Sequence, residues 1–101
     1  MDSEKLIKLG FTNTEAKIYL ILLELNEAQA GLISKKSQIN RTTTYDALER
    51  LLKKGLITYT IQANKKVFKP TPPNKLLEYL KEQEKTAEEL IPELNTLYKS
   101  Q

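Results

Sequence analysis

The segment that decides the fold is AQAGLISKKSQINRTTTYDALERLLKKGLI, residues 28–57. Its pattern predicts a short helix over residues 30–36, a tight turn, and a longer amphipathic helix over residues 41–54. Asn40 is a good N-cap for the second helix, and Gly55 is a residue at which helices end. Two helices joined by such a turn form a helix-turn-helix, a unit whose second helix enters the major groove of DNA.

The residues before this segment predict a supporting scaffold. A short helix is expected over residues 4–9. Thr12 and Glu15 then fit a capping box, in which each side chain satisfies a backbone N–H of the other residue. The helix that follows runs to about Leu25 and is apolar on nearly all sides, which predicts that it is buried. The apolar positions expected to face inward elsewhere are Leu6, Ile7, Leu9, Ala30, Leu32, Ile33, Ile39, Thr44, Leu48, Leu51 and Leu52.

The residues after the segment change from a helical period to an alternating one. Residues 57–61 alternate apolar and polar side chains and predict a half-buried strand, and residues 67–69 predict a second strand. The polar residues 63–66 between them form the turn, with Lys65 and Lys66 near the tip. A β-hairpin directly after a helix-turn-helix is a wing. The fold class is therefore mostly α-helical with a small β-hairpin, a winged helix-turn-helix.

The C-terminal residues predict a long helix that joins two copies of the chain. Prolines 72 and 73 suit the start of a helix. A helix from there would be about 42 Å long at 1.5 Å per residue, too long to bury its apolar side against the preceding domain alone. Its core positions follow a heptad pattern: Leu76, Leu80, Gln83, Ala87, Leu90, Leu94 and Leu97. We therefore divide the chain into a DNA-binding domain, residues 1–70, and a dimerisation helix, residues 71–101.

Pro92 interrupts this helical pattern. It cannot donate a backbone hydrogen bond, and its ring clashes with the carbonyl of Glu88, so a kink or a break is expected near residues 88–91. One kinked helix and an antiparallel pair of helices, residues 74–89 and 92–99, are both compatible with the sequence.

Positive charge is concentrated in the middle of the chain. The net charge is +3, but residues 35–69 hold nine basic residues against two acidic ones, a local net charge of +7. Concentrated positive charge favours binding to a phosphate backbone, because condensed counterions are released. A solvated basic surface would nevertheless give the same count.

Several function classes find no support. The chain has no His and no Cys, so it offers no metal cluster of those ligands, no thiolate and no His-activated nucleophile. It carries no glycine-rich phosphate loop, and we expect no enzyme activity and no cofactor. We also expect no membrane span and no secretory signal, which makes the cytoplasm, in association with the nucleoid, the default location.

The candidate DNA contacts lie on and around the second helix. Arg41, Thr42 and Thr43 occupy its first turn, where such helices reach base edges, and each is a candidate for contact with a base or a phosphate, although the threonines could simply cap the helix. Tyr45 is at the border of the buried side and could contact phosphate or belong to the core. The remaining candidates are Gln38, Asn40, Asp46 and Arg50 near the helix, and Lys35, Lys36, Lys65 and Lys66 as phosphate contacts.

Two segments resemble archaeal winged-helix regulators of the TrmB type. The first is LGFTNTEAKIYLILLEL, residues 9–25, and the second is NRTTTYDALERLLKKGLI, residues 40–57. The resemblance implies DNA binding through the second helix of the motif and dimerisation through the C-terminal helix. Members of that family usually continue into a C-terminal sugar-binding domain, whereas this chain stops after one helix, as a short form would. Sugar regulation is therefore not carried over, and any small-molecule effector is unknown.

Together these features predict a homodimeric regulator that binds specific sequences of double-stranded DNA. Its two recognition helices would address half-sites about 34 Å apart. Two alternatives remain open: an architectural, chromatin-type protein with little sequence preference, and a winged-helix adaptor that binds protein instead of DNA.

Overall fold

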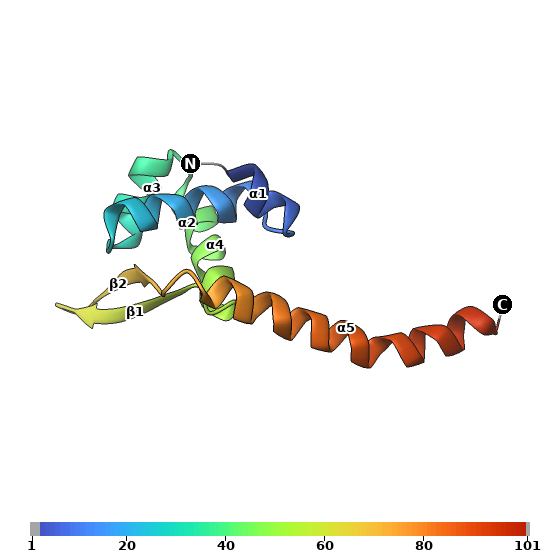
Figure 1. The fold of residues 1–101 in the computed structure, drawn as a ribbon. Helices are drawn as coiled ribbons and strands as arrows, with labels where there is room; N and C mark the ends of the chain where they lie inside the picture. The colour runs from blue at the N-terminus through green and yellow to red at the C-terminus, as the bar shows by residue number, and fades with distance from the viewer. Residues whose placement is uncertain (1–2, 101) are drawn as a thin grey trace.

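The computed structural model describes residues 3–100 as five helices and one antiparallel hairpin (Figure 1). The elements are α1 (Ser3–Lys8), α2 (Asn13–Leu25), α3 (Ala30–Ser37), α4 (Arg41–Lys53), β1 (Ile57–Gln62), β2 (Lys65–Pro70) and α5 (Lys75–Lys99). Helices α1 to α4 and the hairpin form a head, residues 3–71, from which α5 extends away (Figure 1). The predicted winged helix-turn-helix with a long C-terminal helix is confirmed.

Local signals in the sequence set the first two helices. Gly10, at φ +100°, ends α1, and Phe11 donates its backbone N–H back to the carbonyl of Leu6. The capping box is present: Thr12 N–H donates to Glu15 Oε1 at 2.8 Å, and Glu15 N–H donates to Thr12 Oγ1 at 3.0 Å. Helix α2 then buries Ala16, Ile18, Tyr19 and Leu22, so one broad side of it forms the centre of the core.

Three apolar side chains predicted to face inward are exposed instead. Ile7 and Leu9 are 38% and 43% exposed, because a helix as short as α1 presents only one stripe to α2 and Leu6 fills it. Leu32 is 44% exposed on the outer side of α3. Helical period identifies residues that share a side, but a neighbouring element must cover that side before it is buried.

The turn between α3 and α4 is fixed by short-range hydrogen bonds. Gln38 adopts the left-handed conformation, at φ 60°, and ends α3. The hydroxyls of Ser34 and Thr44 both donate to the carbonyl of Ile39. Asn40 caps α4 as predicted, accepting the backbone N–H of Thr43 at 2.8 Å. The second helix is therefore held at a fixed angle to the first.

The wing is longer and its turn tighter than the sequence predicts. Lys65 and Lys66 belong to β2, paired with Gln62 and Ile61, and not to the turn. The turn is only Ala63 and Asn64, both at positive φ, which is the type I′ geometry favoured in hairpins. Of the residues in β1 only the first, Ile57, is buried, so the half-buried pattern holds at the root of the wing and not at its tip.

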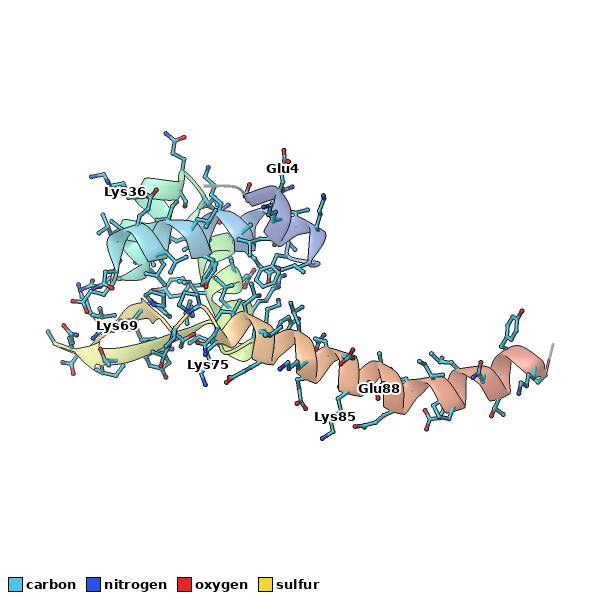
Figure 2. All side chains as sticks on the ribbon, viewed as in Figure 1. Glu4, Lys36, Lys69, Lys75, Lys85 and Glu88 are labelled. Atoms are coloured by element: carbon cyan, nitrogen blue, oxygen red, sulfur yellow. The ribbon has the colours of Figure 1, made fainter. Side chains whose placement is uncertain are left out.

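Helix α5 is continuous through Pro92, and the pair of short helices is thus excluded. Figures 1 and 2 show its axis changing direction close to Glu88, the residue whose carbonyl loses its partner at Pro92. The predicted kink is present, but the remaining hydrogen bonds carry the helix past it. Near its start, Leu76 and Tyr79 pack against the core of the head. Residues 81–99 are exposed along their whole length.

Candidate nucleic-acid interface

The buried side of α4 defines which side faces outward. Thr44, Ala47, Leu48 and Leu51 are buried against the head. Successive residues of an α-helix are rotated by about 100°, so the positions opposite this group follow from the geometry. They are Thr42, Asp46, Glu49 and Lys53, all exposed. This outer stripe contains two predicted contacts, Thr42 and Asp46, and adds two residues that the first-turn argument missed.

The other predicted contacts on α4 lie beside the outer stripe. Arg41 and Tyr45, four residues apart, share the side toward the wing, and Tyr45 is 45% exposed rather than in the core. Thr43 and Arg50 lie on the opposite flank by the same rotation. Asn40 has a structural task as well, since its side-chain oxygen already accepts the capping hydrogen bond.

A cavity of about 550 Å³ separates the start of α3, the first turn of α4 and the tip of the wing. Four of the predicted contacts, Arg41, Tyr45, Lys65 and Lys66, line it. Its lining also includes Gln29, Gly31 and Asn64, which sequence reasoning did not single out. Only the folded chain brings the wing tip to the start of α4, so no local pattern could have identified them.

Lys35, Lys36 and Gln38 lie away from this cavity. Both lysines are exposed in the last turn of α3, and Figure 2 shows Lys36 directed away from the wing. Gln38, also exposed, ends the same helix. Positive side chains are therefore exposed in two separate places, at the end of α3 and on the wing.

Not every basic residue of the middle segment is available to a partner. Lys69 pairs with Glu27 at 3.3 Å, and Lys54 pairs with the buried carboxylate of Glu15. Lys66 lies over the ring of Tyr59, with Nζ 4.6 Å from the ring centroid, but its charge is not neutralised there. The sequence count of +7 therefore overstates the charge that this surface can offer, because it treats paired and unpaired lysines alike.

The Lys54–Glu15 pair ties the end of α4 to the rest of the molecule. The Lys54 ammonium also lies 5.3 Å from the ring of Phe11 and 5.8 Å from the ring of Tyr79 on α5. Burial alone would raise the pKa of Glu15, but the Lys54 ammonium and the hydrogen bonds from Thr12 outweigh it and hold this pKa below its usual value. The recognition helix is thereby anchored to both α2 and α5.

Other kinds of site are not apparent in the described part of the chain. Within residues 3–100, no group of three or more carboxylates is arranged to hold a metal ion. A second cavity of about 530 Å³ lies between the end of α4, the wing root and α5, and its lining mixes lysines with Glu78 and Glu82. Among the same residues, no helix is both long and apolar enough to cross a membrane.

Comparison with known proteins agrees with this geometry. The model of a family described as sugar-specific transcriptional regulator TrmB matches residues 6–74. The HTH-type sugar sensing transcriptional regulator TrmBL1 of Pyrococcus furiosus is 33% identical over 97 residues, which are 96% of this chain and 26% of that protein. This chain thus spans about a quarter of the length of that relative.

Solved structures with little sequence identity share the fold. The archaeal chromatin protein TrmBL2 superposes with a TM-score of 0.73 at 22% identity, covering 97% of this chain and 40% of that one. A mutant of Staphylococcus aureus MepR bound to an oligodeoxyribonucleotide gives a TM-score of 0.65 at 20% identity, covering 97% and 79%. The family and these relatives are transcription regulators and DNA-binding proteins rather than enzymes.

Proposed function

The chain belongs to the TrmB family of transcriptional regulators, and from this premise we propose that it binds specific sequences of double-stranded DNA as a homodimer. Residues 1–70 serve as the DNA-binding domain and residues 71–101 as the dimerisation helix. The protein acts in the cytoplasm, in association with the nucleoid.

The observation that carries the DNA proposal is the exposed outer stripe of α4, together with exposed basic side chains at the end of α3 and on the wing. The stripe presents Thr42 and Asp46, side chains that can exchange hydrogen bonds with base edges in the major groove. Lys35 and Lys36 at the end of α3, and Lys65 and Lys66 on the wing, would contact the phosphate backbone. Phosphate contacts set position and affinity, whereas base contacts set sequence preference.

The dimer proposal is supported by the exposed seam of α5. Leu90, Leu94 and Leu97 are 45%, 54% and 65% exposed, at heptad spacing on a helix that leaves the head. A second copy of the same helix fits such a seam, because identical heptads present matching knobs and holes. The pairing would set two recognition helices about one turn of DNA, or 34 Å, apart.

Selection of bound sequences from a random duplex pool, at a stated salt concentration, tests this function. We expect enrichment of a two-fold symmetric motif whose half-sites are centred about 10 base pairs apart. Enrichment without a motif, combined with tight binding to all duplexes, would favour the chromatin-type alternative. Absence of binding to any duplex at low salt would contradict DNA binding and leave the protein-adaptor alternative.

A matched pair of variants separates sequence reading from general attraction. Thr42→Ala together with Asp46→Ala should reduce the preference for the selected motif over a scrambled duplex. Lys35→Ala together with Lys36→Ala should weaken binding to both duplexes by similar factors and flatten the salt dependence. Fluorescence anisotropy with both duplexes at several salt concentrations measures the two effects.

A further inference from the structure

The cavity between α3, α4 and the wing concentrates positive charge from segments far apart in the chain. Arg41 comes from the first turn of α4, and Lys65 and Lys66 come from the wing. Tyr45 adds a phenol hydroxyl and Asn64 adds an amide. Among the described residues that line the cavity, none is Asp or Glu. This is the composition expected of a site for an anion and not for a cation or an apolar ligand.

The Arg41 guanidinium does not lie on the outer stripe of α4. A Cβ atom added at Gly31 would lie 3.7 Å from Arg41 Nη2 and 3.9 Å from Arg41 Cζ, so the guanidinium lies against the first turn of α3. It is directed into the cavity, on the side of α4 toward the wing. Because Gly31 has no side chain, nothing at that position fills the space beside the guanidinium.

We propose that this cavity binds one phosphate of the DNA backbone, and that Arg41 is a phosphate-binding residue rather than a base-reading one. The inference rests on the proposed function and assigns a role within it. A planar guanidinium can hold two phosphate oxygens at once, while the lysine ammonium groups supply point charges. The volume of about 550 Å³ is many times the roughly 30 Å³ of one water molecule, which leaves room for a hydrated phosphodiester.

Such a shared phosphate would couple the wing to the recognition helix. The wing reaches the site through Lys65 and Lys66, and α4 reaches it through Arg41. A phosphate held from both elements fixes how deeply α4 enters the groove and how it is rotated there. Base reading then falls to the outer stripe, above all to Thr42 and Asp46. The sequence alone leaves Arg41 between base and phosphate contact, because its place in the first turn says nothing about its direction.

Binding measured against salt tests the role of Arg41. For Arg41→Ala we expect weaker binding to the selected and the scrambled duplex by similar factors, so that the preference between them is unchanged. The slope of log K against log salt should fall by about 0.9 for each cavity that binds a phosphate. Thr42→Ala is the matched control in the same turn and should change the preference instead. A change of preferred base in Arg41→Ala, with an unchanged slope, would overturn the proposal.

Uncharged phosphate analogues test whether the wing and α4 share the site. A duplex carrying one methylphosphonate at each backbone position in turn should reveal one position per half-site that weakens binding of the wild type. In Arg41→Ala, and also in Lys65→Ala with Lys66→Ala, a methylphosphonate at that position should no longer weaken binding. The losses of binding free energy caused by the two sets of substitutions should not add when they are combined. Arg50→Ala, on the opposite flank, should keep it. Independent positions for Arg41 and the wing lysines would contradict a shared phosphate.

A substitution at Gly31 tests the cavity without removing a charge. Gly31 lies inside α3 and has no positive φ, so the helix accepts other residues there. Gly31→Ala makes only ordinary van der Waals contact with Arg41 and should bind DNA as the wild type does. Gly31→Gln places a long side chain beside the guanidinium and should weaken binding to both duplexes. Its thermal unfolding should match that of the wild type, which would show that the fold is intact. Equal binding by both variants would argue against an occupied cavity.

The outcomes also separate this inference from the proposed function. If the wild type binds no duplex, the function itself fails. Suppose instead that the wild type binds duplex, but that inorganic phosphate at constant ionic strength fills the cavity at concentrations as low as the duplex concentration at half-maximal binding. The site would then belong to a free anion. We expect no such saturation when the amide signals of Gly31 and Asn64 are followed by NMR.

Discussion

The head and α5 differ in how they use leucine: the head buries its central leucines, and the outer part of α5 exposes its own. In the head, Leu22 and Leu51 are fully buried, and Leu48 is 1% exposed. In the outer part of α5, Leu90 and Leu94 are 45% and 54% exposed, although they repeat at regular heptad spacing. The head therefore buries its central leucines among its own residues, while the outer part of α5 leaves the leucines of its seam exposed.

This difference shows where each region obtains its stability. An isolated helix is marginal in water, and most helices are stabilised by packing of an apolar side. Beyond Leu80, α5 has no such packing among residues 3–100. The head has its core and also the buried Lys54–Glu15 pair, which lies where α5 begins. Substitutions on the two sides of this junction should thus separate association from folding.

The largest effect should come from charges placed in the seam. Leu90→Lys with Leu94→Lys removes two leucines from each copy, or four from the dimer interface. Burying each leucine contributes about 1.5–3 kcal/mol of free energy. We expect a dimer of the wild type at micromolar concentration in sedimentation velocity, and a monomer of the variant. The unfolding of the head should change little. Asn95→Lys with Thr96→Lys adds the same charge outside the seam and should leave the dimer intact; a monomeric wild type would contradict the seam argument.

Sequence and structure agree best where a feature depends on neighbours within a few residues. The capping box at Thr12 and the N-cap at Asn40 were predicted because each bond spans three residues. The change of period predicts the hairpin, but the predicted turn is too wide and the predicted burial of the first strand holds only at Ile57. Pro92 shows the limit of a local rule: the lost hydrogen bond bends α5, but whether a helix also breaks depends on the rest of its bonds.

Features that depend on distant residues were not predicted. Lys54 and Glu15 are 39 positions apart, and both look like surface charges in the sequence. Arg41 is a candidate for base or phosphate contact in the sequence, and only the fold brings Gly31 and the wing tip beside it. The predicted burial of Ile61 is wrong for the same reason: its side chain is 61% exposed because the wing tip extends beyond the core. The sequence names Arg41, Tyr45, Lys65 and Lys66 as candidates one by one, but it does not predict their grouping around one cavity.

An intermediate effect is expected from breaking the ion pair at the junction. Lys54→Met leaves the Glu15 carboxylate buried without its cation, a change that costs about 3 kcal/mol in comparable buried pairs. Lys53→Met, at an exposed position next to it, is the matched control and should alter the free energy of unfolding by less than about 0.5 kcal/mol. Urea unfolding of both variants measures the difference. Equal stability of the two would show that the pair contributes little to the head.

The smallest effect should appear when the same pair is titrated with acid. The pKa of Glu15 is lowered in the folded chain, so its contribution to stability is complete above about pH 4.3, the ordinary glutamate value, and is lost as the pH falls through the lower folded value. The free energy of unfolding of the wild type should exceed that of Glu15→Gln by on the order of 1 kcal/mol near neutral pH. This excess should shrink only below about pH 4.3. In Lys54→Met the lowering cation is gone and burial, which raises the pKa of Glu15, is opposed only by Thr12. The folded pKa then no longer lies as far below the unfolded one, so this variant should lose less stability than the wild type as the pH falls below about 4.3. Urea unfolding of the three proteins between pH 3 and 6 measures these losses, and an equal loss with and without Lys54 would mean that the ion pair does not set the acid stability of the head.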